Sequence, residues 1–269
     1  MIRMIIGVIY AALFFIIGMP VQLVLYLIGR KNENLRDRGA RRVVQFGCRG
    51  LLAICGVKVK VEGAENLPKD GEAVLYVGNH RSFFDVFVGY PYFPSVTGYV
   101  AKKEFAVFWP LRYWVILVRG VFIDRNDMKQ SMKAIVEAIQ NVKKGISMVI
   151  YPEGTRSRGE SELDMLPFKE GSMKIAEKAR CPVIPMAMTH TQDIFEKQFP
   201  LVKPQHVTLR FGEPVDLSAL PKEERKFSGN LMRDKIRGML EEMLAEENTE
   251  NQKNTDQGKG SHQADSRQE

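Results

Sequence analysis

The feature that most constrains this chain is an uncharged apolar run near its start. Residues 4–29 contain no charged side chain, and Gln22 is the only strongly polar one. As a helix this run would be about 39 Å long, whereas the hydrocarbon core of a bilayer is about 30 Å thick. The run therefore predicts a membrane helix. It either spans the bilayer or is kinked at Gly18 or Pro20 and returns to the side it entered.

A cleaved signal peptide is the alternative for such a run. Its apolar segment is usually about 7–15 residues, which is shorter, and no convincing small-residue cleavage site follows here. Only Arg3 and the terminal amine precede the run, whereas basic side chains gather after it. The positive-inside rule then places the rest of the chain on the cytoplasmic side of the cell membrane. These basic residues are Arg30, Lys31, Arg36, Arg38, Arg41, Arg42 and Arg49.

Residues 35–55 form a second segment, in which arginines are interleaved with apolar side chains such as Val43 and Phe46. This pattern predicts a basic helix lying at a lipid headgroup surface. A solvated helix packed on the following domain fits the same pattern. In both cases residues 1–56 are predicted to be a membrane-anchoring pair of hydrophobic and basic helices.

Residues 57–246 alternate strand-like and helix-like segments, which predicts an α/β domain with a mixed sheet flanked by helices. Strands are expected at 57–62, 73–78, 99–101, 115–123, 147–151, 183–189 and 207–211. Helices are expected from near Ser82, in part over 104–112 where Pro110 interrupts, and over 128–144, 171–179 and 231–244. Residues 247–269 contain almost no apolar side chains, so they are predicted to be a disordered polar tail.

The net charge of +7 and the pI of about 9.2 suit nucleic acid, anionic lipid or phosphorylated substrates as partners. No nucleic-acid-reading motif is identifiable, so nucleic acid is not predicted as a partner. Cys48, Cys55 and Cys181 have spacings unlike those of a zinc site, and their odd number leaves no closed disulfide framework. We expect reduced thiols in packing positions.

The run NHRSFFD directly follows an apolar strand segment, where α/β folds place their sites. On one continuous helix His80 and Asp85 would point about 140° apart, so they meet only if His80 lies in the loop and Asp85 in the first helical turn. The pattern Ser82-x-x-Asp85 resembles a capping box and supports this arrangement. The alternative is that Asp85 only caps the helix and His80 is an ordinary loop histidine.

A histidine can accept the proton of a hydroxyl that attacks a carbonyl, and a carboxylate on its other ring nitrogen fixes the tautomer. The chain has no G-x-S-x-G nucleophile elbow. Its absence argues against a serine hydrolase and leaves direct transfer to a hydroxyl that the substrate brings.

The run YPEGTRSRG follows another strand, and Gly154 allows tight backbone geometry there. Arg156 and Arg158 offer forked donors that suit phosphate oxygens. Arg125 ends a further strand in the run VFIDR. Taken alone, these runs also fit a charged surface turn and a solvated strand end.

Pro185 lies within an apolar strand segment, where a proline suggests an edge strand or a bulge. The run LPFKEG indicates a turn into a helix. No ligand-like partners are evident for His190, His206 or His262, so no metal site is predicted.

Together these runs resemble the glycerolipid acyltransferase family. NHRSFFD resembles its His-x4-Asp motif, and VFIDR, YPEGTRSRG and CPVIPMAM resemble its second, third and fourth blocks in the same order. LPFKEG and AKKEF are also similar to this family, and the resemblance covers residues 57–215. The pattern is most similar to that of bacterial-type 1-acyl-sn-glycerol-3-phosphate acyltransferases.

The resemblance implies a glycerol-3-phosphate acyltransferase-like fold, with His80 as general base and Asp85 as its partner. It implies an acceptor site whose arginines bind phosphate, with Lys103 adding charge and Pro185 shaping the wall. The other implied acceptor-site residues are Arg125, Glu153, Gly154, Thr155 and Arg156. It implies neither a bound cofactor nor a metal.

The implied reaction transfers a fatty acyl group from acyl-CoA or acyl carrier protein (acyl-ACP) to lysophosphatidic acid, forming phosphatidic acid in phospholipid biosynthesis. The expected partners are these substrates and membrane lipids. An alternative within the same chemistry is another acceptor: glycerol 3-phosphate, a different lysophospholipid or a lyso-aminolipid. An alternative of another class is a non-catalytic membrane protein that binds anionic lipid through its basic surface.

Overall fold

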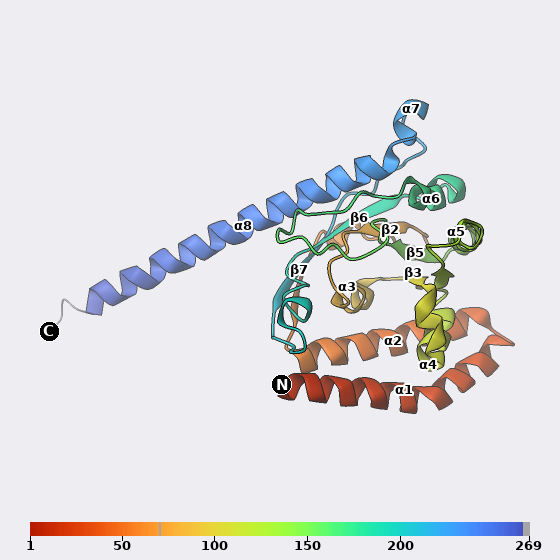
Figure 1. Cartoon of the computed structure of the whole chain (residues 1–269), viewed down its shortest axis with the longest axis horizontal. Helices are drawn as coiled ribbons and strands as arrows, with labels where there is room; N and C mark the ends of the chain where they lie inside the picture. The colour runs from red at the N-terminus through yellow and green to blue at the C-terminus, as the bar shows by residue number, and fades with distance from the viewer. Residues whose placement is uncertain (70, 266–269) are drawn as a thin grey trace.

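The computed structural model describes residues 1–69 and 71–265 (Figure 1). Its helices are α1 (Ile2–Gly29), α2 (Glu33–Cys55), α3 (Phe84–Gly89), α4 (Trp109–Leu117), α5 (Met128–Lys143), α6 (Lys174–Ala179), α7 (Lys222–Arg225) and α8 (Ser228–Asp265). Its strands are β1 (Lys58–Glu62), β2 (Leu75–Gly78), β3 (Thr97–Lys102), β4 (Val121–Ile123), β5 (Ser147–Ile150), β6 (Val183–Met188) and β7 (His206–Phe211). The 3₁₀ turns η3 (Lys103–Val107) and η5 (Glu196–Gln198) border the candidate site described below.

The strands form one seven-stranded sheet in the order β1-β7-β6-β2-β5-β3-β4. Strands β6 and β7 run antiparallel, and the other neighbouring pairs are parallel. Strands β2, β5 and β6 are apolar along most of their length and buried throughout, as expected where helices cover both faces of a sheet. The predicted mixed sheet flanked by helices is confirmed.

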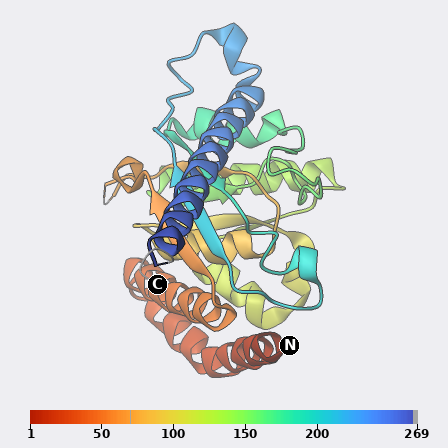
Figure 2. The same ribbon diagram turned by 90° about the vertical axis from the view of Figure 1, so that its left-hand side faces the viewer.

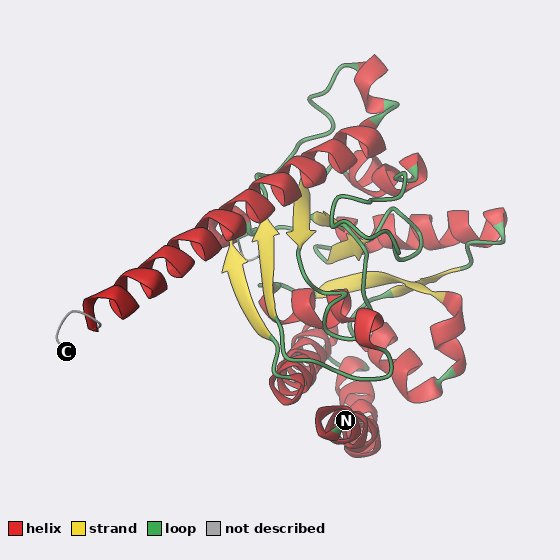
Figure 3. Cartoon of the chain, turned by 60° about the vertical axis from the view of Figure 1, so that its left-hand side comes forward, coloured by secondary structure: helices red, strands yellow, loops and turns green. Residues whose placement is uncertain are grey.

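Helices cover the two faces of the sheet and meet two apolar clusters (Figures 1 and 3). On one face, helices α2 and α3 pack on a cluster that includes Tyr76 and Ile184. On the other, helices α5, α6 and α8 pack on a cluster that includes Leu75 and Val183. Neighbouring residues of one strand thus belong to opposite clusters, as the alternation of side chains along a strand requires.

Helices α1 and α2 form an antiparallel hairpin at one end of the molecule, with α1 outermost (Figures 1 and 2). Helix α1 is long and apolar enough to cross a membrane, judged by length and composition. Most of its large apolar side chains are exposed, including Ile9, Ile16 and Leu23. Pro20 lies inside the helix without ending it. The predicted apolar helix at the start of the chain is therefore present.

Helix α2 presents two different faces. Arg41 and Arg49 donate hydrogen bonds to the backbone carbonyls of Pro94 and Pro91, the latter over 2.8 Å, so this side of α2 lies against the domain. Arg38, Arg42 and Phe46, at a helical spacing of four, are exposed. One face therefore packs on the domain, while a basic face with an aromatic side chain remains open.

The three cysteines are free thiols and are buried, as expected for packing positions. Cys48 and Cys55 lie in the core cluster beneath α2, and Cys181 lies in the cluster on the other face. Burial raises the pKa of the Cys48 thiol to about 12, so this thiol stays protonated at neutral pH.

Two expectations for residues 104–123 are wrong. Residues 115–117 belong to helix α4 rather than to a strand, because Pro110, Trp114 and Leu117 bury one face at helical spacing. Pro110 also does not interrupt a helix. It lies in the first turn of α4, where the missing N–H has no intrahelical partner to lose.

Pro185 lies in an inner strand, so the interpretation as an edge strand is wrong. The bulge interpretation fits. Between the pairs Met186–Phe211 and Val183–Val215, strand β6 advances by three residues and its partner segment by four. The missing N–H of Pro185 falls in this irregular stretch, while its carbonyl accepts a hydrogen bond from Gly212 N over 2.8 Å.

Helix α8 extends further than predicted. It continues through Asp265, beyond residue 244, into the stretch for which the sequence predicted a disordered tail. Glu, Gln, Lys and Ala occur repeatedly in residues 245–265, and all four have high helix propensity. The boundaries at 1–56, 57–246 and 247–269 stay predictions, and residues 266–269 of the tail lie outside the described residues.

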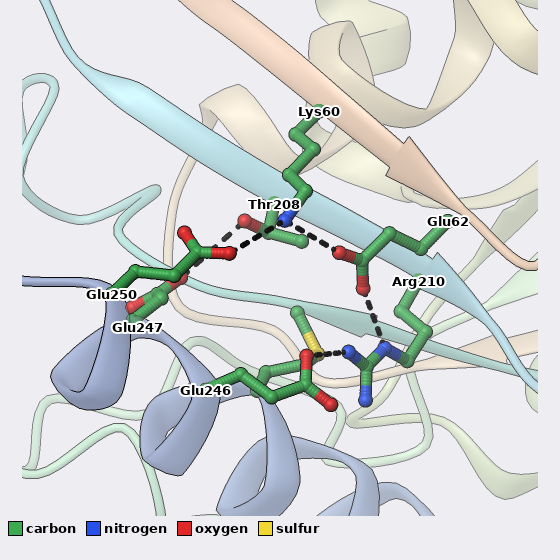
Figure 4. Close-up of a pocket in the computed structure, with 8 residues that line it drawn as sticks. Lys60, Glu62, Thr208, Arg210, Glu246, Glu247 and Glu250 are labelled. Carbon is green, nitrogen blue, oxygen red and sulfur yellow. Dashed lines mark hydrogen bonds and ion pairs between the residues drawn. The ribbon is translucent and has the colours of Figure 1, made fainter. Parts of the chain in front are cut away.

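A charged network fastens α8 to strands β1 and β7 around a shallow depression (Figure 4). Arg210 pairs with Glu62 over 2.6 Å and with Glu246 over 2.5 Å, and Lys60 pairs with Glu62 over 3.0 Å. Each such partly exposed pair contributes about 0–1 kcal/mol to stability. Arg210 of β7 thus links Glu62 of β1 to Glu246 of α8.

We expect the contact between His190 and α8 to weaken as pH rises. Burial disfavours the charged ring, but pairing with Glu247 at 2.7 Å and Asp193 at 3.2 Å outweighs burial and raises the His190 pKa. Stability from a raised histidine pKa is present below the unfolded value of about 6.5 and lost as pH rises through the folded value.

The test is thermal unfolding in detergent at pH 6 and pH 8 for the wild type and His190→Asn. Asparagine tolerates the positive φ of 60° at this position. The wild type should be more stable than the variant at pH 6, and this difference should shrink at pH 8. A difference that does not change with pH would contradict the assignment.

Candidate active site

Four parallel strands end at one edge of the sheet, and the polar runs found in the sequence follow these ends. Strands β2, β5, β3 and β4 are adjacent and parallel. His80 follows β2, Arg156 follows β5, Lys103 follows β3 and Arg125 follows β4. The carboxyl ends of parallel strands are where α/β folds build binding sites, and this edge is therefore the candidate site.

His80 and Asp85 form a hydrogen-bonded pair at this edge. His80 Nδ1 lies 2.7 Å from Asp85 Oδ2. The Asp85 side chain is 1% exposed, whereas the His80 side chain is 17% exposed. When the imidazole is neutral, a hydrogen bond from Nδ1–H to the buried carboxylate leaves the ring lone pair at Nε2. The pair can therefore present a base to a substrate.

The local sequence explains how residues five apart meet. Helix α3 begins at Phe84, so His80 lies in the preceding loop and Asp85 in the first turn, as predicted. Asp85 Oδ2 accepts hydrogen bonds from the backbone N–H groups of Arg81 and Ser82 over 2.8 and 2.9 Å. Ser82 Oγ in turn accepts from Phe84 N over 3.0 Å. The same Asp85 oxygen thus binds the backbone of the turn that leads into α3 and the ring of His80.

Tyr151 supports the imidazole from one side. Its ring stacks on His80 with centroids 4.4 Å apart and planes 11° apart. Tyr151 is buried, which raises its pKa well above the ordinary tyrosine value and keeps the phenol neutral. The sequence placed Tyr151 in a motif without giving it a role; its position directly after strand β5 is the only signal.

Glu153 is tied to backbone rather than open to a substrate. Its carboxylate is buried and accepts from His80 N over 2.6 Å and from Leu166 N over 2.8 Å. Burial raises the Glu153 pKa, and the backbone donors work against that shift. The carbonyl of His80 accepts from Ser157 N over 2.8 Å. The loop after β5 therefore holds the His80 backbone on both sides, and Glu153 has a supporting position.

Gly154 turns the loop after β5, and Thr155 follows at the surface. Gly154 has φ of +76°, and a Cβ atom there would lie 2.9 Å from Lys169 Nζ and 3.0 Å from its Cε. The positive φ favours glycine at this position, whereas the end of the flexible Lys169 side chain could move aside. Thr155 is exposed, so its hydroxyl is accessible to a ligand.

Arg156 lies between an acidic and an aromatic side chain. Its Nη1 donates to Glu196 Oε1 over 2.8 Å, and its Cζ lies 3.8 Å from the centroid of the Phe83 ring. The Arg156 side chain is 27% exposed. Among the residues that the structure describes, its Nε and Nη2 have no hydrogen-bond partner. Arg156 can therefore still donate to an anion.

Lys103 and Arg125 lie at the neighbouring strand ends. Lys103 Nζ forms an ion pair with Asp124, the residue before Arg125. Arg125 is half-buried, and burial lowers its pKa from the ordinary value without neutralising it. The η3 turn that carries Lys103 brings Phe105 within 6.5 Å of Phe83, centroid to centroid. The Phe83 ring thus contacts Arg156 on one side, while its aromatic neighbour Phe105 lies on the turn that carries Lys103.

Pro185 is not brought to His80. Its neighbours Val183 and Ala187 belong to the apolar cluster under α5, α6 and α8, whereas Tyr151 belongs to the opposite cluster. A Cβ atom at Gly212 would lie 2.8 Å from Pro185 Cγ and 2.9 Å from Met239 Sδ, so the proline ring lies near α8. The structure therefore gives Pro185 no place in the wall beside His80.

Arg81 is a fully buried cation that the sequence analysis did not single out. Its guanidinium donates to Gln192 Oε1 over 2.8 Å and to Gly159 O over 2.7 Å, and its Nε lies 3.2 Å from Glu162 Oε2. These contacts join the loops after β2, β5 and β6. The three loops are far apart in the sequence, and no spacing pattern links them. The sequence therefore carries no signal for the contacts of Arg81.

Contrary to expectation, His190 does have ligand-like partners. Glu162, His190 and Asp193 offer donor atoms within 4.8 Å of one another. Their acidic groups already face cations, because Glu162 pairs with Arg81 and Asp193 with Lys197. The arrangement is therefore accounted for by ion pairing within the chain.

Comparison with known proteins agrees with this geometry. Residues 58–189 match the family model described as Acyltransferase. The 1-acyl-sn-glycerol-3-phosphate acyltransferase of Helicobacter pylori is 32% identical over 191 residues, covering 71% of this chain and 75% of that protein. The enzyme of the same name from Borreliella burgdorferi is 30% identical over 191 residues, covering 71% and 74%.

Other relatives are longer. The yeast protein named 1-acyl-sn-glycerol-3-phosphate acyltransferase is 30% identical over 195 residues, which is 72% of this chain but 63% of that protein. The matches cover 53% and 57% of the coconut and Limnanthes douglasii proteins. The crystal structure of the 1-acyl-sn-glycerophosphate (LPA) acyltransferase PlsC from Thermotoga maritima superposes with a TM-score of 0.77 at 24% identity. That match covers 91% of this chain and 95% of that one, and it shows that the two share a fold.

In its neutral form, the His80 ring should carry its proton on Nδ1, because Asp85 accepts a hydrogen bond there. Nitrogen-15 NMR distinguishes the tautomers, and the chain has only four histidines to assign. In Asp85→Asn, the amide no longer selects Nδ1–H, and the signal of this tautomer should weaken. An unchanged spectrum in the variant would mean that Asp85 does not set the tautomer.

Proposed function

Because this chain belongs to the acyltransferase family that includes bacterial 1-acyl-sn-glycerol-3-phosphate acyltransferases, we propose that it acylates lysophosphatidic acid to phosphatidic acid. The observation that carries this proposal is the 2.7 Å bond between His80 Nδ1 and the buried carboxylate of Asp85. It supports a base at Nε2 in a site bordered by cationic side chains.

The proposed step is a direct transfer. His80 Nε2 takes the proton of the acceptor hydroxyl as its oxygen attacks the carbonyl carbon of the acyl thioester. The new C–O bond forms, the C–S bond breaks, and the proton passes from His80 to the leaving thiolate. Asp85 stabilises the imidazolium between these steps, and the nearby backbone bonds of Glu153 keep His80 in place.

The acceptor phosphate is assigned to the cationic groups at the strand ends. Arg156 keeps free N–H donors, and Arg125 and Lys103 add charge from the neighbouring strands. Gly154 and Thr155 lie between Arg156 and the strand and provide a surface beside the phosphate. Holding the phosphate fixes the hydroxyl near His80, which is a proximity effect.

The donor in this proposal is acyl-CoA or acyl-ACP, used as a co-substrate, and no bound cofactor is required. Glycerol 3-phosphate, a different lysophospholipid or a lyso-aminolipid would use the same base. A non-catalytic lipid-binding protein would need only the basic surface. The buried Asp85 on His80 favours catalysis, because lipid binding has no use for an oriented imidazole.

The apolar surface of α1 continues onto η3 and α4. Phe15 and Phe108 contact edge to face with centroids 5.0 Å apart, and Gln22 Nε2 donates to Pro110 O over 2.9 Å. A Cβ atom at Gly18 would lie 3.1 Å from the Trp114 ring. Six large apolar side chains are exposed over the segment from η3 to α4, namely Phe105, Val107, Phe108, Trp109, Tyr113 and Ile116.

We propose that this surface lies in the cytoplasmic leaflet of the cell membrane. Apolar side chains exposed on one side favour a lipid partner, and aromatic residues are favoured at the headgroup level. The basic residues that follow α1 support the cytoplasmic side, since they attract anionic lipid there. Phe105 adjoins Phe83 beside Arg156, so a lipid acceptor would reach the site without leaving the membrane.

Replacing the base should abolish transfer. Membranes carrying the wild type should transfer a labelled acyl chain from acyl-CoA or acyl-ACP to lysophosphatidic acid. His80→Ala should reduce this rate by about 10²- to 10⁴-fold, the usual contribution of a general base. His206→Ala, at an exposed position at the start of β7, is the matched control and should keep full activity.

The outcomes separate the alternatives. Wild-type activity on another acceptor alone would keep the chemistry and change the substrate. Equal activity of the His80→Ala variant and the wild type would refute the assignment of His80 as the general base. If neither the wild type nor the variant transfers acyl groups to any lysolipid, the lipid-binding interpretation replaces the enzymatic one.

The two tryptophans report the membrane surface directly. Trp109 is 52% exposed, and Trp114 is 3% exposed. In the Trp114→Phe variant, emission from Trp109 should shift to the blue on addition of anionic vesicles, and lipids brominated on the acyl chain should quench it. Acrylamide quenching should fall in parallel. Unchanged emission and full acrylamide access in the presence of vesicles would place η3 and α4 outside the membrane.

A further inference from the structure

One carboxylate joins the start of α3 to Arg156. Glu196 Oε2 accepts from Ser82 Oγ over 2.6 Å, and Glu196 Oε1 accepts from Phe83 N over 2.8 Å. Glu196 Oε1 also accepts from Arg156 Nη1 over 2.8 Å. The Glu196 side chain is 19% exposed, so these contacts are partly shielded from water.

Glu196 is itself held in a fixed position. It begins the η5 turn, which follows Ile194, a side chain buried completely in the core. The backbone of this segment is tied by Lys197 N to Gln192 O over 3.2 Å and by Lys203 N to Ile194 O over 3.0 Å. Charge-assisted hydrogen bonds to a carboxylate with a fixed backbone restrict its partners strongly.

The two partners of Glu196 have different tasks in the proposed function, on which this inference rests. The start of α3 carries Ser82, whose N–H binds the same Asp85 oxygen that orients His80. Arg156 is assigned to the acceptor phosphate. Glu196 is the one described side chain that bonds directly to both parts.

We propose that Glu196 is a positioning residue that fixes the distance between the phosphate-binding guanidinium and the base, and thereby the acceptor hydroxyl that reaches His80. Without Glu196, the contact with the Phe83 ring would remain, but the long Arg156 side chain would be free to change its conformation. Glu196 uses one nitrogen of Arg156 and leaves Nε and Nη2 for the phosphate, so it orients the guanidinium without occupying it.

The proposal predicts an effect confined to acceptors that carry phosphate. In Glu196→Ala, kcat/KM for lysophosphatidic acid should fall about 10- to 100-fold, the loss expected when a reacting group shifts by about 1 Å. The KM for the acyl donor should not change. Monoacylglycerol offers a hydroxyl without a phosphate, so the variant and the wild type should acylate it at the same slow rate.

A double-mutant cycle tests the route through Arg156. Arg156→Ala should lower kcat/KM for lysophosphatidic acid, and adding Glu196→Ala to it should cause little further loss. Glu196→Gln keeps an oxygen for one donor, so its loss should be smaller than that of Glu196→Ala. Lys197→Ala is the control on the same turn, since Lys197 pairs with Asp193 and should leave all values unchanged.

Three results would overturn the inference. They are unchanged kinetics in Glu196→Ala, an equal loss with and without the acceptor phosphate, and an additive loss in the Arg156→Ala background. Each of these results counts against the inference when the wild type is active on lysophosphatidic acid. A wild type inactive on every lysolipid would instead refute the proposed function, and this inference with it.

Discussion

The candidate site depends on the buried carboxylate of Asp85. A carboxylate that is 1% exposed is stable only where donors replace the water it has lost. One of its oxygens receives two backbone N–H groups and the His80 ring. The loop after β2 must fold back over the first turn of α3 to supply these donors, and this fold brings residues five apart together. One carboxylate oxygen therefore fixes both the turn before α3 and the His80 ring, and any change at Asp85 disturbs both.

The loop that carries His80 is held from two directions. The loop after β5 binds the His80 backbone through Glu153 and Ser157, and the segment after β6 binds the next residue, Arg81, through Gln192. His80 follows strand β2, which lies between β5 and β6 in the sheet. Because β2 runs parallel to both neighbours, the loops that follow the three strands meet at one edge. The position of His80 is thus fixed by the order of the strands rather than by its own loop.

The sequence predicts what short spacing encodes and misses what packing decides. His80 and Asp85 are close along the chain, and Arg125 and Arg156 lie in polar runs that follow apolar strands, so the sequence pattern identifies these four residues. Glu196 acts across more than 100 residues, and nothing in its neighbourhood distinguishes it from an ordinary surface acid. The sequence predicts a strand at residues 115–117 because Val115 and Ile116 are β-branched, whereas contacts of Trp114 with α1 favour a helix there.

The position of the site relative to the apolar surface follows from the same sheet edge. Strand β3 ends in η3, so its carboxyl end provides Lys103 to the site and, two residues later, Phe105 to the exposed apolar surface of η3 and α4. One short turn therefore carries a cationic side chain next to an exposed aromatic one. An amphipathic acceptor, with phosphate and acyl chain at opposite ends, matches this arrangement. A soluble phosphorylated acceptor would use only half of it, which is why the structure favours a lysolipid over glycerol 3-phosphate as the proposed substrate.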